Sequence, residues 1–173
     1  NFTNITAGES VVFQAGRHIT FSTTTNTITT AGGALHLEAD SPHSSSGASS
    51  SGAADGTGTL TLGNITTNGG AVTLIGANFS LNQNINAGAG AISLAKSQNN
   101  TALSTGQTSD PEIDRLLTTG TLTLGRATTA GAAGTGSGNV LTISTFTADA
   151  AISNTSTSGF SIIANDGVTL NRD

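Results

Sequence analysis

The densest group of side chains able to do chemistry is formed by His36, Glu38, Asp40 and His43. Imidazoles and carboxylates are ligands for Zn²⁺ and other transition metals. On an extended strand the first three would share one outward face, about 6–7 Å between successive positions. That spacing is too wide for one ion without a bend, and His43 lies beyond Pro42. We therefore expect a polar strand face that runs into a solvated loop, and no metal site.

A second group of oxygen ligands, Asp110, Glu112 and Asp114, could form a weak Ca²⁺ site. However, the chain has neither EF-hand spacing nor the Gly-Gly-x-Gly-x-Asp repeat of calcium-binding solenoids. We expect these acids to cap and solubilise a projecting loop, and we expect no cofactor.

Catalysis is not expected from this sequence. Glycoside hydrolysis needs two carboxylates about 5–9.5 Å apart, one of them with a raised pKa. Here the ten acidic and five basic residues are scattered, and the chain has no Tyr or Trp to stack on sugar rings. No Gly-x-Ser-x-Gly elbow accompanies a suitably placed His.

Composition narrows the classes of partner. The net charge of −5 and the pI of about 4.8 leave no basic patch for nucleic acid. No apolar run approaches the roughly 18 residues that span a bilayer, so membrane insertion is not expected. The absence of Cys excludes disulfides and thiolate metal sites. Without an initiator Met or a signal peptide, the chain is expected to be a segment of a longer protein.

The segments expected to position these side chains alternate apolar and polar residues with a period of two. A triplet with apolar first and third residues recurs, and such alternation predicts strands with one buried face. The interval from Val72 to Ile92 and that from Leu122 to Leu141 are nearly equal. Stacked at about 4.8 Å per coil, such strands predict an all-β, right-handed parallel β-helix (β-solenoid) with roughly 19–20-residue coils. The residues expected in its core are Leu35, Leu37, Leu60, Leu62, Val72, Leu74, Ile92, Leu94, Leu122, Leu124, Leu141, Ile143, Phe160 and Ile162.

Two segments, 41–57 and 97–119, interrupt this spacing and are predicted to be loop insertions in a single solenoid domain spanning 1–173. Each contains one of the two prolines, and proline cannot donate to an interior ladder. The second is expected to carry a short helical turn over 111–117. The interval from Leu60 to Val72 is shorter than a full coil and leaves two interpretations open: a later part of the coil begun at Leu35, or a misregistered strand.

Glycines precede most of the triplets and are expected to turn corners with positive φ. They are Gly32, Gly33, Gly58, Gly69, Gly70, Gly90, Gly120, Gly138 and Gly159.

Four strings resemble filamentous-haemagglutinin-type repeats: Thr59-Leu-Thr-Leu-Gly63, Gly70-Ala-Val-Thr-Leu74, Gly90-Ala-Ile-Ser-Leu94 and Thr121-Leu-Thr-Leu-Gly125. That family comprises large bacterial exoproteins and adhesins, many exported by two-partner secretion. The resemblance implies a right-handed β-helical shaft on the cell surface or secreted, exported through an outer-membrane transporter. It also implies adhesion to a receptor or glycan on a host cell, a neighbouring cell or the matrix. No Asn-Pro-Asn-Gly-type secretion motif is present, so the stretch is expected to be shaft.

The sequence therefore predicts a non-catalytic structural shaft of a bacterial adhesin whose projecting loops contact a partner. The alternative is a carbohydrate-binding or polysaccharide-degrading β-helix.

Overall fold

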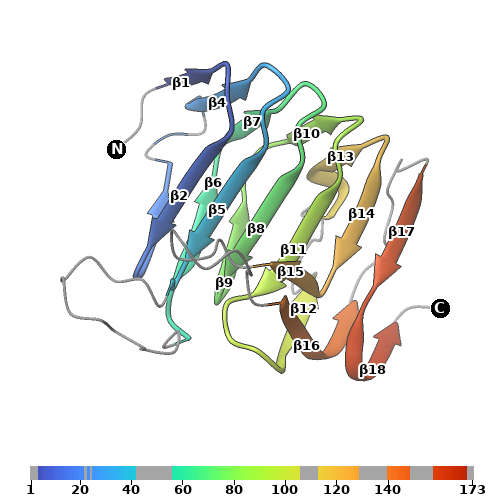
Figure 1. Ribbon diagram of the computed structural model, residues 1–173. Helices are drawn as coiled ribbons and strands as arrows, with labels where there is room; N and C mark the ends of the chain where they lie inside the picture. Colours follow the sequence, from blue (N-terminus) through green and yellow to red (C-terminus); the bar gives the residue numbers. More distant parts are fainter. Residues whose placement is uncertain are drawn as a thin grey trace.

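The protein is all-β, with parallel strands in stacked sheets (Figure 1). This computed structural model describes residues 4–21, 23, 25–41, 56–105, 113–128, 140–148 and 158–170. The strands are β1 (Asn4–Ala7), β2 (Val11–Ala15), β3 (Ile19–Thr20), β4 (Thr27–Thr30), β5 (Leu35–Ala39), β6 (Thr59–Leu62), β7 (Asn64–Thr66), β8 (Val72–Gly76), β9 (Asn78–Leu81), β10 (Ile85–Gly88), β11 (Ile92–Lys96), β12 (Thr101–Thr105), β13 (Leu116–Thr118), β14 (Thr121–Leu124), β15 (Arg126–Thr128), β16 (Val140–Ala148), β17 (Gly159–Ile162) and β18 (Ala164–Leu170). A 3₁₀ turn, η1 (Ile113–Arg115), precedes β13. Among the described residues no helix is long and apolar enough to cross a membrane.

Over its first three rounds the chain visits three sheets in turn, and β12, β15, β16 and β18 form a fourth sheet. Sheet A has the order β1-β4-β7-β10-β13, sheet B has the order β17-β14-β11-β8-β5-β2, and sheet C has the order β3-β6-β9. The first three rounds therefore run A, B, C, and each new strand pairs in parallel with its counterpart one round earlier. The long strands of sheet B lie side by side in Figure 1.

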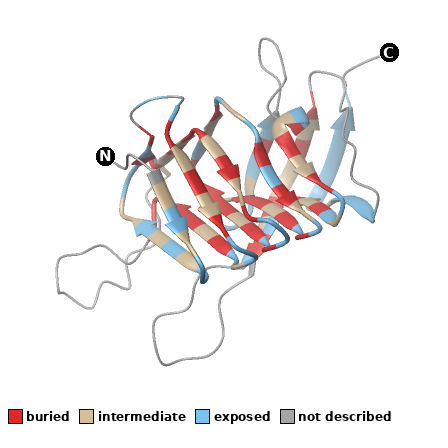
Figure 2. Ribbon diagram, turned by 90° about the horizontal axis from the view of Figure 1, so that it is seen from above, coloured by how far each residue is buried: buried red, intermediate tan, exposed pale blue. Residues whose placement is uncertain are grey.

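Registered apolar columns form the core between the sheets. On sheet A, Ile28 pairs with Ile65, which pairs with Ile85 and then Leu116, and all four side chains are buried. Alternation places every second side chain of each strand inside, so a few branched aliphatics per round fill a narrow interior (Figure 2). This arrangement lets a chain with only 35% hydrophobic residues bury a continuous core.

Most of the predicted core residues are buried as expected, with the exception of the last two. Phe160 is 42% exposed and Ile162 is half-buried, although they pair with Leu122 and Leu124. They lie in β17, the terminal strand of sheet B, so no further described strand stacks on them. Leu141 is buried, but in a cluster outside the main core.

The spacing of the rounds is less regular than the sequence predicts. On sheet B only the round from Val72 to Ile92 has the expected length, and the strand paired with β14 is β17, not the one that holds Leu141. The short spacing after Leu60 is resolved in favour of the first interpretation, because β6 lies in sheet C and completes the round begun by β4 and β5.

The expectation of a single loop insertion over 97–119 is too broad. This segment contains β12, which pairs with β16, and β13, which extends sheet A. The expected helical turn is present only as η1, since residues 111 and 112 lie outside the described residues and 116–118 form a strand. In the other expected insertion, 41–57, residues 42–55 lie outside the described residues.

The glycines before the strands of sheet B act mainly through close packing rather than through positive φ. Gly32, Gly69 and Gly159 have positive φ as predicted. The prediction is wrong for Gly33, Gly58, Gly70, Gly90 and Gly120, and Gly138 lies outside the described residues. A Cβ on Gly70 would lie 2.1 Å from the carbonyl oxygen of Gly33, and one on Gly90 would lie 2.2 Å from that of Gly70. Successive rounds therefore meet at a column of glycines where no side chain fits.

A hairpin covers part of the outer face of sheet B. Strands β15 and β16 pair antiparallel, with Ala127 opposite Leu141. These two side chains pack with Ile75 of β8 and Ala95 of β11 in a second buried cluster, separate from the main core. Ile75 and Ala95 lie one residue beyond inward-facing leucines, so the alternation turns them outward, beneath the hairpin.

Candidate functional site

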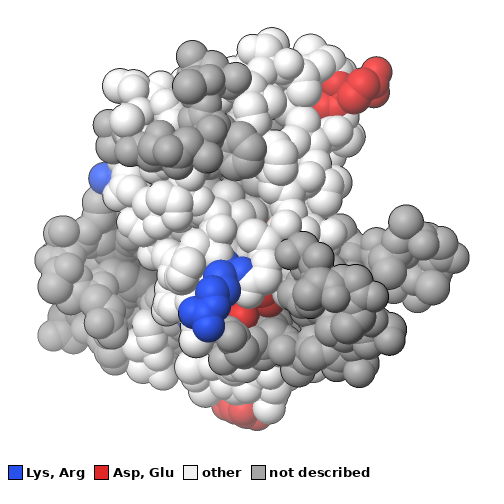
Figure 3. Space-filling model, turned by 90° about the vertical axis from the view of Figure 1, so that its left-hand side faces the viewer, with Lys and Arg blue, Asp and Glu red and all other residues white. Residues whose placement is uncertain are grey.

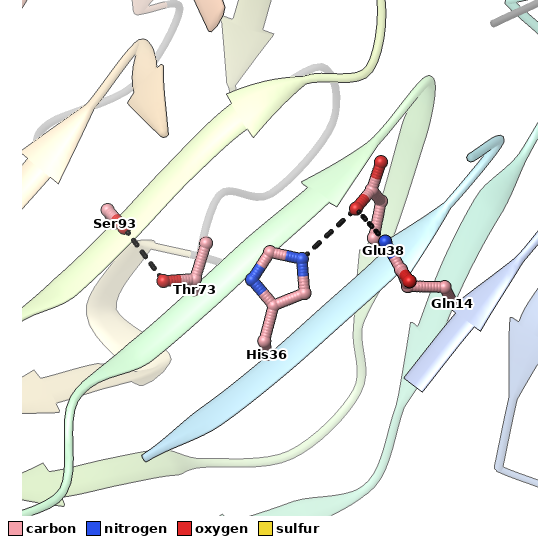
Figure 4. A network of polar contacts seen from close by, with 5 residues as sticks. All are labelled: Gln14, His36, Glu38, Thr73 and Ser93. Atoms are coloured by element: carbon pink, nitrogen blue, oxygen red, sulfur yellow. Dashed lines mark hydrogen bonds and ion pairs between the residues drawn. The ribbon is translucent and has the colours of Figure 1, made fainter. Parts of the chain in front are cut away.

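The candidate site lies on the outer face of sheet B, where Gln14, His36 and Glu38 form a hydrogen-bonded network (Figure 4). The register places Gln14 of β2 opposite Glu38 of β5. The Gln14 side-chain amide donates to Oε2 of Glu38 at 2.8 Å, and His36 Nε2 lies 3.1 Å from the same oxygen. His36 and Glu38 share one strand face, as their spacing of two predicts. The side chain of Glu38 is 1% exposed and that of His36 is 14% exposed.

This network keeps the Glu38 carboxylate ionised. Burial raises the pKa of Glu38, but hydrogen bonds from His36, Gln14 and Ser41, together with the charge of His36, lower it by more. The net pKa lies below its ordinary value. A carboxylate that is buried, ionised and held by several donors is well suited to joining neighbouring strands and poorly suited to donating a proton.

Asp40 does not join this network, contrary to the expectation of one face shared by His36, Glu38 and Asp40. It follows the end of β5, and its φ of 62° lies in the left-handed region, which Asp tolerates better than most residues. The turn directs its carboxylate elsewhere. Oδ2 of Asp40 accepts hydrogen bonds from the Gly56 backbone N–H at 2.9 Å and from the Ser97 hydroxyl at 2.6 Å.

Asp40 therefore joins three distant parts of the chain. It is 1% exposed, and Gly56 and Ser97 lie 16 and 57 residues further along the chain. Residues 42–55 connect Asp40 and Ser41 to Gly56, so the carboxylate holds the two ends of that segment together. Its carboxylate thus links Gly56 and Ser97 to the end of β5.

The remaining candidate ligands do not assemble into a site within the described part of the chain. His43, Asp110 and Glu112 lie outside the described residues. Asp114 is exposed in η1, and its neighbour Arg115 donates to the carbonyl oxygen of Leu81, which ties η1 to the end of β9. Among the described residues no group of three or more His, Asp or Glu could hold a metal ion.

The same strand face carries a row of short hydroxyl side chains next to His36. The register places Thr73 beside His36, followed by Ser93, Thr123 and Ser161. The oxygens of Ser93 and Thr73 are 3.4 Å apart. Across these described strands His36 is hydrogen-bonded to Glu38 and Thr73 to Ser93, and the imidazole lies between Glu38 and Thr73 (Figure 4). Among these described residues no hydrogen bond joins the imidazole to a hydroxyl group.

Sequence reasoning did not identify Gln14, Ser97 or Lys96 as members of polar contacts. Lys96 is half-buried, its ammonium donates to the carbonyl oxygen of Ala77, and burial lowers its pKa. The parallel register, which brings position 14 beside 38, is the signal that could have found Gln14. Ser97 could not have been found this way, because its contact with Asp40 spans two rounds of the chain.

Comparisons with protein-family models, with curated proteins and with solved structures find no match to this chain.

Proposed function

We propose that this chain is a segment of a right-handed parallel β-helix that serves as a non-catalytic shaft of a secreted or cell-surface bacterial adhesin. The observation that carries the proposal is the set of registered columns running from round to round, such as Ile28, Ile65, Ile85 and Leu116. A stack of this kind extends along one axis, because each round contacts mainly its neighbours and each further round lengthens it without widening it.

The polar groups support the same proposal because they serve the stack. Glu38 joins β2 to β5 through Gln14, and Asp40 joins the ends of the segment 42–55 to Ser97. Both carboxylates are buried and engaged by several donors, which leaves them structural. In a shaft of this kind the segments that the sequence predicts to be loop insertions, such as 41–57, are the parts proposed to contact a receptor or glycan. Export through an outer-membrane transporter belongs to the same proposal, and it rests on the resemblance to filamentous-haemagglutinin-type repeats.

The experiment combines a binding assay with an assay for catalysis. The chain is applied to a glycan array and to cultured host cells, and it is incubated with polysaccharides while new reducing ends are measured. If the chain is a shaft whose predicted loop insertions bind a partner, no new reducing ends should form. Binding should be lost in a variant that lacks residues 44–51, and the melting temperature of that variant should change little.

Three further variants complete this experiment. Glu38→Gln alters the buried network without altering 44–51, and it should retain binding. Release of reducing ends that is abolished by His36→Ala would overturn the proposal in favour of the polysaccharide-degrading β-helix. Glycan binding that survives the deletion of 44–51 and is lost in Thr73→Lys would instead place recognition on the outer face of sheet B.

A further inference from the structure

The corner between β7 and β8 carries the only Asn-Gly dipeptide in the sequence, Asn68-Gly69. Asparagine is a labile residue, and a following glycine makes it most prone to deamidation, because no side chain hinders attack by the glycine nitrogen. Both residues are exposed, so water reaches them. The groups needed for a self-modification reaction therefore lie together at a solvated turn of the stack.

Two hydrogen bonds to neighbouring rounds hold these groups in place. The Gly69 backbone N–H donates to the carbonyl oxygen of Ala87 in β10 at 3.0 Å. The Asn68 side-chain amide donates to the carbonyl oxygen of Thr30 in β4 at 2.7 Å. The nitrogen that must attack is thus bound to the next round, and the nitrogen that must leave is bound to the previous one. A hydrogen-bonded amide loses its proton only when the bond opens.

We propose that Asn68 is a deamidation site controlled by the stacking of the rounds: it is inert while β4, β7 and β10 are joined, and it reacts when they separate. In the reaction the Gly69 nitrogen bonds to Cγ of Asn68 and closes a succinimide ring. The side-chain nitrogen leaves as ammonia, taking the proton that Gly69 loses. Water then opens the ring at either carbonyl carbon and leaves aspartate or isoaspartate. Water is the only co-reactant, and nothing is oxidised or reduced.

Either product opposes the return of the rounds to their stacked positions. A carboxylate at position 68 has no N–H to donate to the Thr30 carbonyl oxygen. Isoaspartate also lengthens the main chain by one methylene group. The corner has no room for this, since a Cβ on the adjacent Gly70 would already lie 2.1 Å from the carbonyl oxygen of Gly33. A transient opening of the stack is thereby recorded as a covalent change.

The test measures deamidation of the full chain in mildly alkaline buffer, by peptide mass spectrometry and ion-exchange chromatography. Few charged side chains lie on the described part of the face seen in Figure 3, and the net charge is −5, so one added carboxylate changes retention measurably. Asn68 should react roughly tenfold or more slowly in the folded chain than in the chain unfolded in urea. In urea, Asn68→Asp should abolish the mass gain at this position, and Gly69→Ala should slow it.

A variant that separates the rounds gives the sharper comparison. In Gly90→Ala the new Cβ would lie 2.2 Å from the carbonyl oxygen of Gly70, between the same rounds that the Gly69 N–H joins. This variant leaves the Asn-Gly dipeptide unchanged, and it should speed hydrogen exchange of Gly69 and deamidation of Asn68 by the same factor. The control Gly8→Ala, where nothing lies within 4 Å of the new Cβ, should change neither rate.

If thermal melts show that Gly90→Ala does not fold, the wild-type chain in low concentrations of urea replaces it, and the two rates should rise together. Deamidation of Asn68 as fast in the folded chain as in urea would overturn the proposal. So would the absence of deamidation at Asn68 in urea. Faster hydrogen exchange at Gly69 with an unchanged rate of deamidation would do the same, because the contacts between rounds would then not control the reaction.

Discussion

The column of glycines between sheets A and B predicts a large difference between substitutions at two adjacent positions. In Gly70→Ala the new Cβ would lie 2.1 Å from the Gly33 carbonyl oxygen and 2.6 Å from its carbon. In Gly69→Ala nothing lies within 4 Å of the new Cβ, but the residue has a φ of +104°, which is unfavourable for alanine. The first substitution tests contact between rounds, and the second tests backbone conformation alone.

The magnitude follows from the distances. To relieve the Gly70→Ala clash, the two rounds must move apart until the approach of 2.1 Å reaches an ordinary contact of 3.4 Å. A displacement of that size breaks hydrogen bonds such as Gly32 N–H to Thr67 O, now 3.0 Å long. Overpacking costs about 1–3 kcal/mol, and each lost buried hydrogen bond costs about 1 kcal/mol. We therefore expect Gly70→Ala to lower the free energy of unfolding by about 3–5 kcal/mol. Gly69→Ala should lower it by about 1–2 kcal/mol.

The assay is urea and thermal unfolding of both variants, with Gly8→Ala as a control. Gly8 lacks both constraints, because nothing lies within 4 Å of its new Cβ and its φ is not positive. A loss of about 3–5 kcal/mol corresponds to a fall in melting temperature of roughly 6–20 °C for a chain of this size. If Gly70→Ala unfolds like the wild-type chain, or is less destabilised than Gly69→Ala, the rounds are not in contact at these glycines.

Further substitutions test the core and the polar contacts. Leu74→Asp places an unpaired charge at a fully buried position and should destabilise the chain by more than about 4 kcal/mol in a urea titration. In the same titration Thr73→Asp, on the outer face, should lower the free energy of unfolding far less. Because the pKa of Glu38 in the folded chain lies below its ordinary value of 4.5, ionised Glu38 stabilises the fold above that pH, and the contribution is lost as the pH falls toward the folded-state pKa. Glu38→Gln should therefore lower stability at neutral pH and flatten its decline on acidification; an unchanged pH profile would show that the network is not energetically important. Asp40→Ala removes the acceptor for Gly56 and Ser97 and should lower the free energy of unfolding by about 2–4 kcal/mol. Asp40→Asn keeps an acceptor and a residue that tolerates positive φ. Chemical unfolding should therefore place its stability between those of Asp40→Ala and the wild-type chain.

Alternation along the chain was sufficient to predict strands and their buried faces, but not the sheet to which each strand belongs. The strings Thr59-Leu-Thr-Leu-Gly63 and Thr121-Leu-Thr-Leu-Gly125 are identical, yet β6 lies in sheet C and β14 in sheet B. Both sheets have an inner and an outer face, so both require the same period of two. Sheet membership is determined by the length of the preceding corner and by the partner strand, and alternation records neither.

Alternation likewise predicted one part of the candidate site and not the rest. The shared face of His36 and Glu38 follows from their spacing, whereas the departure of Asp40 depends on a single positive φ at the end of β5. The hairpin of β15 and β16 was not predicted, because its antiparallel pairing connects segments on either side of 129–139. Exposure of Phe160 follows from its place in a terminal strand, which a local pattern does not reveal.

The register of the rounds is the central claim, and pairs of cysteines test it most directly in a chain that has no native Cys. Thr73 and Ser93 are paired across β8 and β11, and Thr29 and Thr66 across β4 and β7. Neighbouring strands lie about 4.8 Å apart, within the Cα separation that a disulfide accepts. The double variants Thr73→Cys/Ser93→Cys and Thr29→Cys/Thr66→Cys should therefore form intramolecular disulfides under mild oxidation. Thr61→Cys/Thr123→Cys, which joins the two identical strings, should not, because these residues lie in different sheets. Rapid disulfide formation in the last variant, with none in the first two, would contradict the stacking described for this protein.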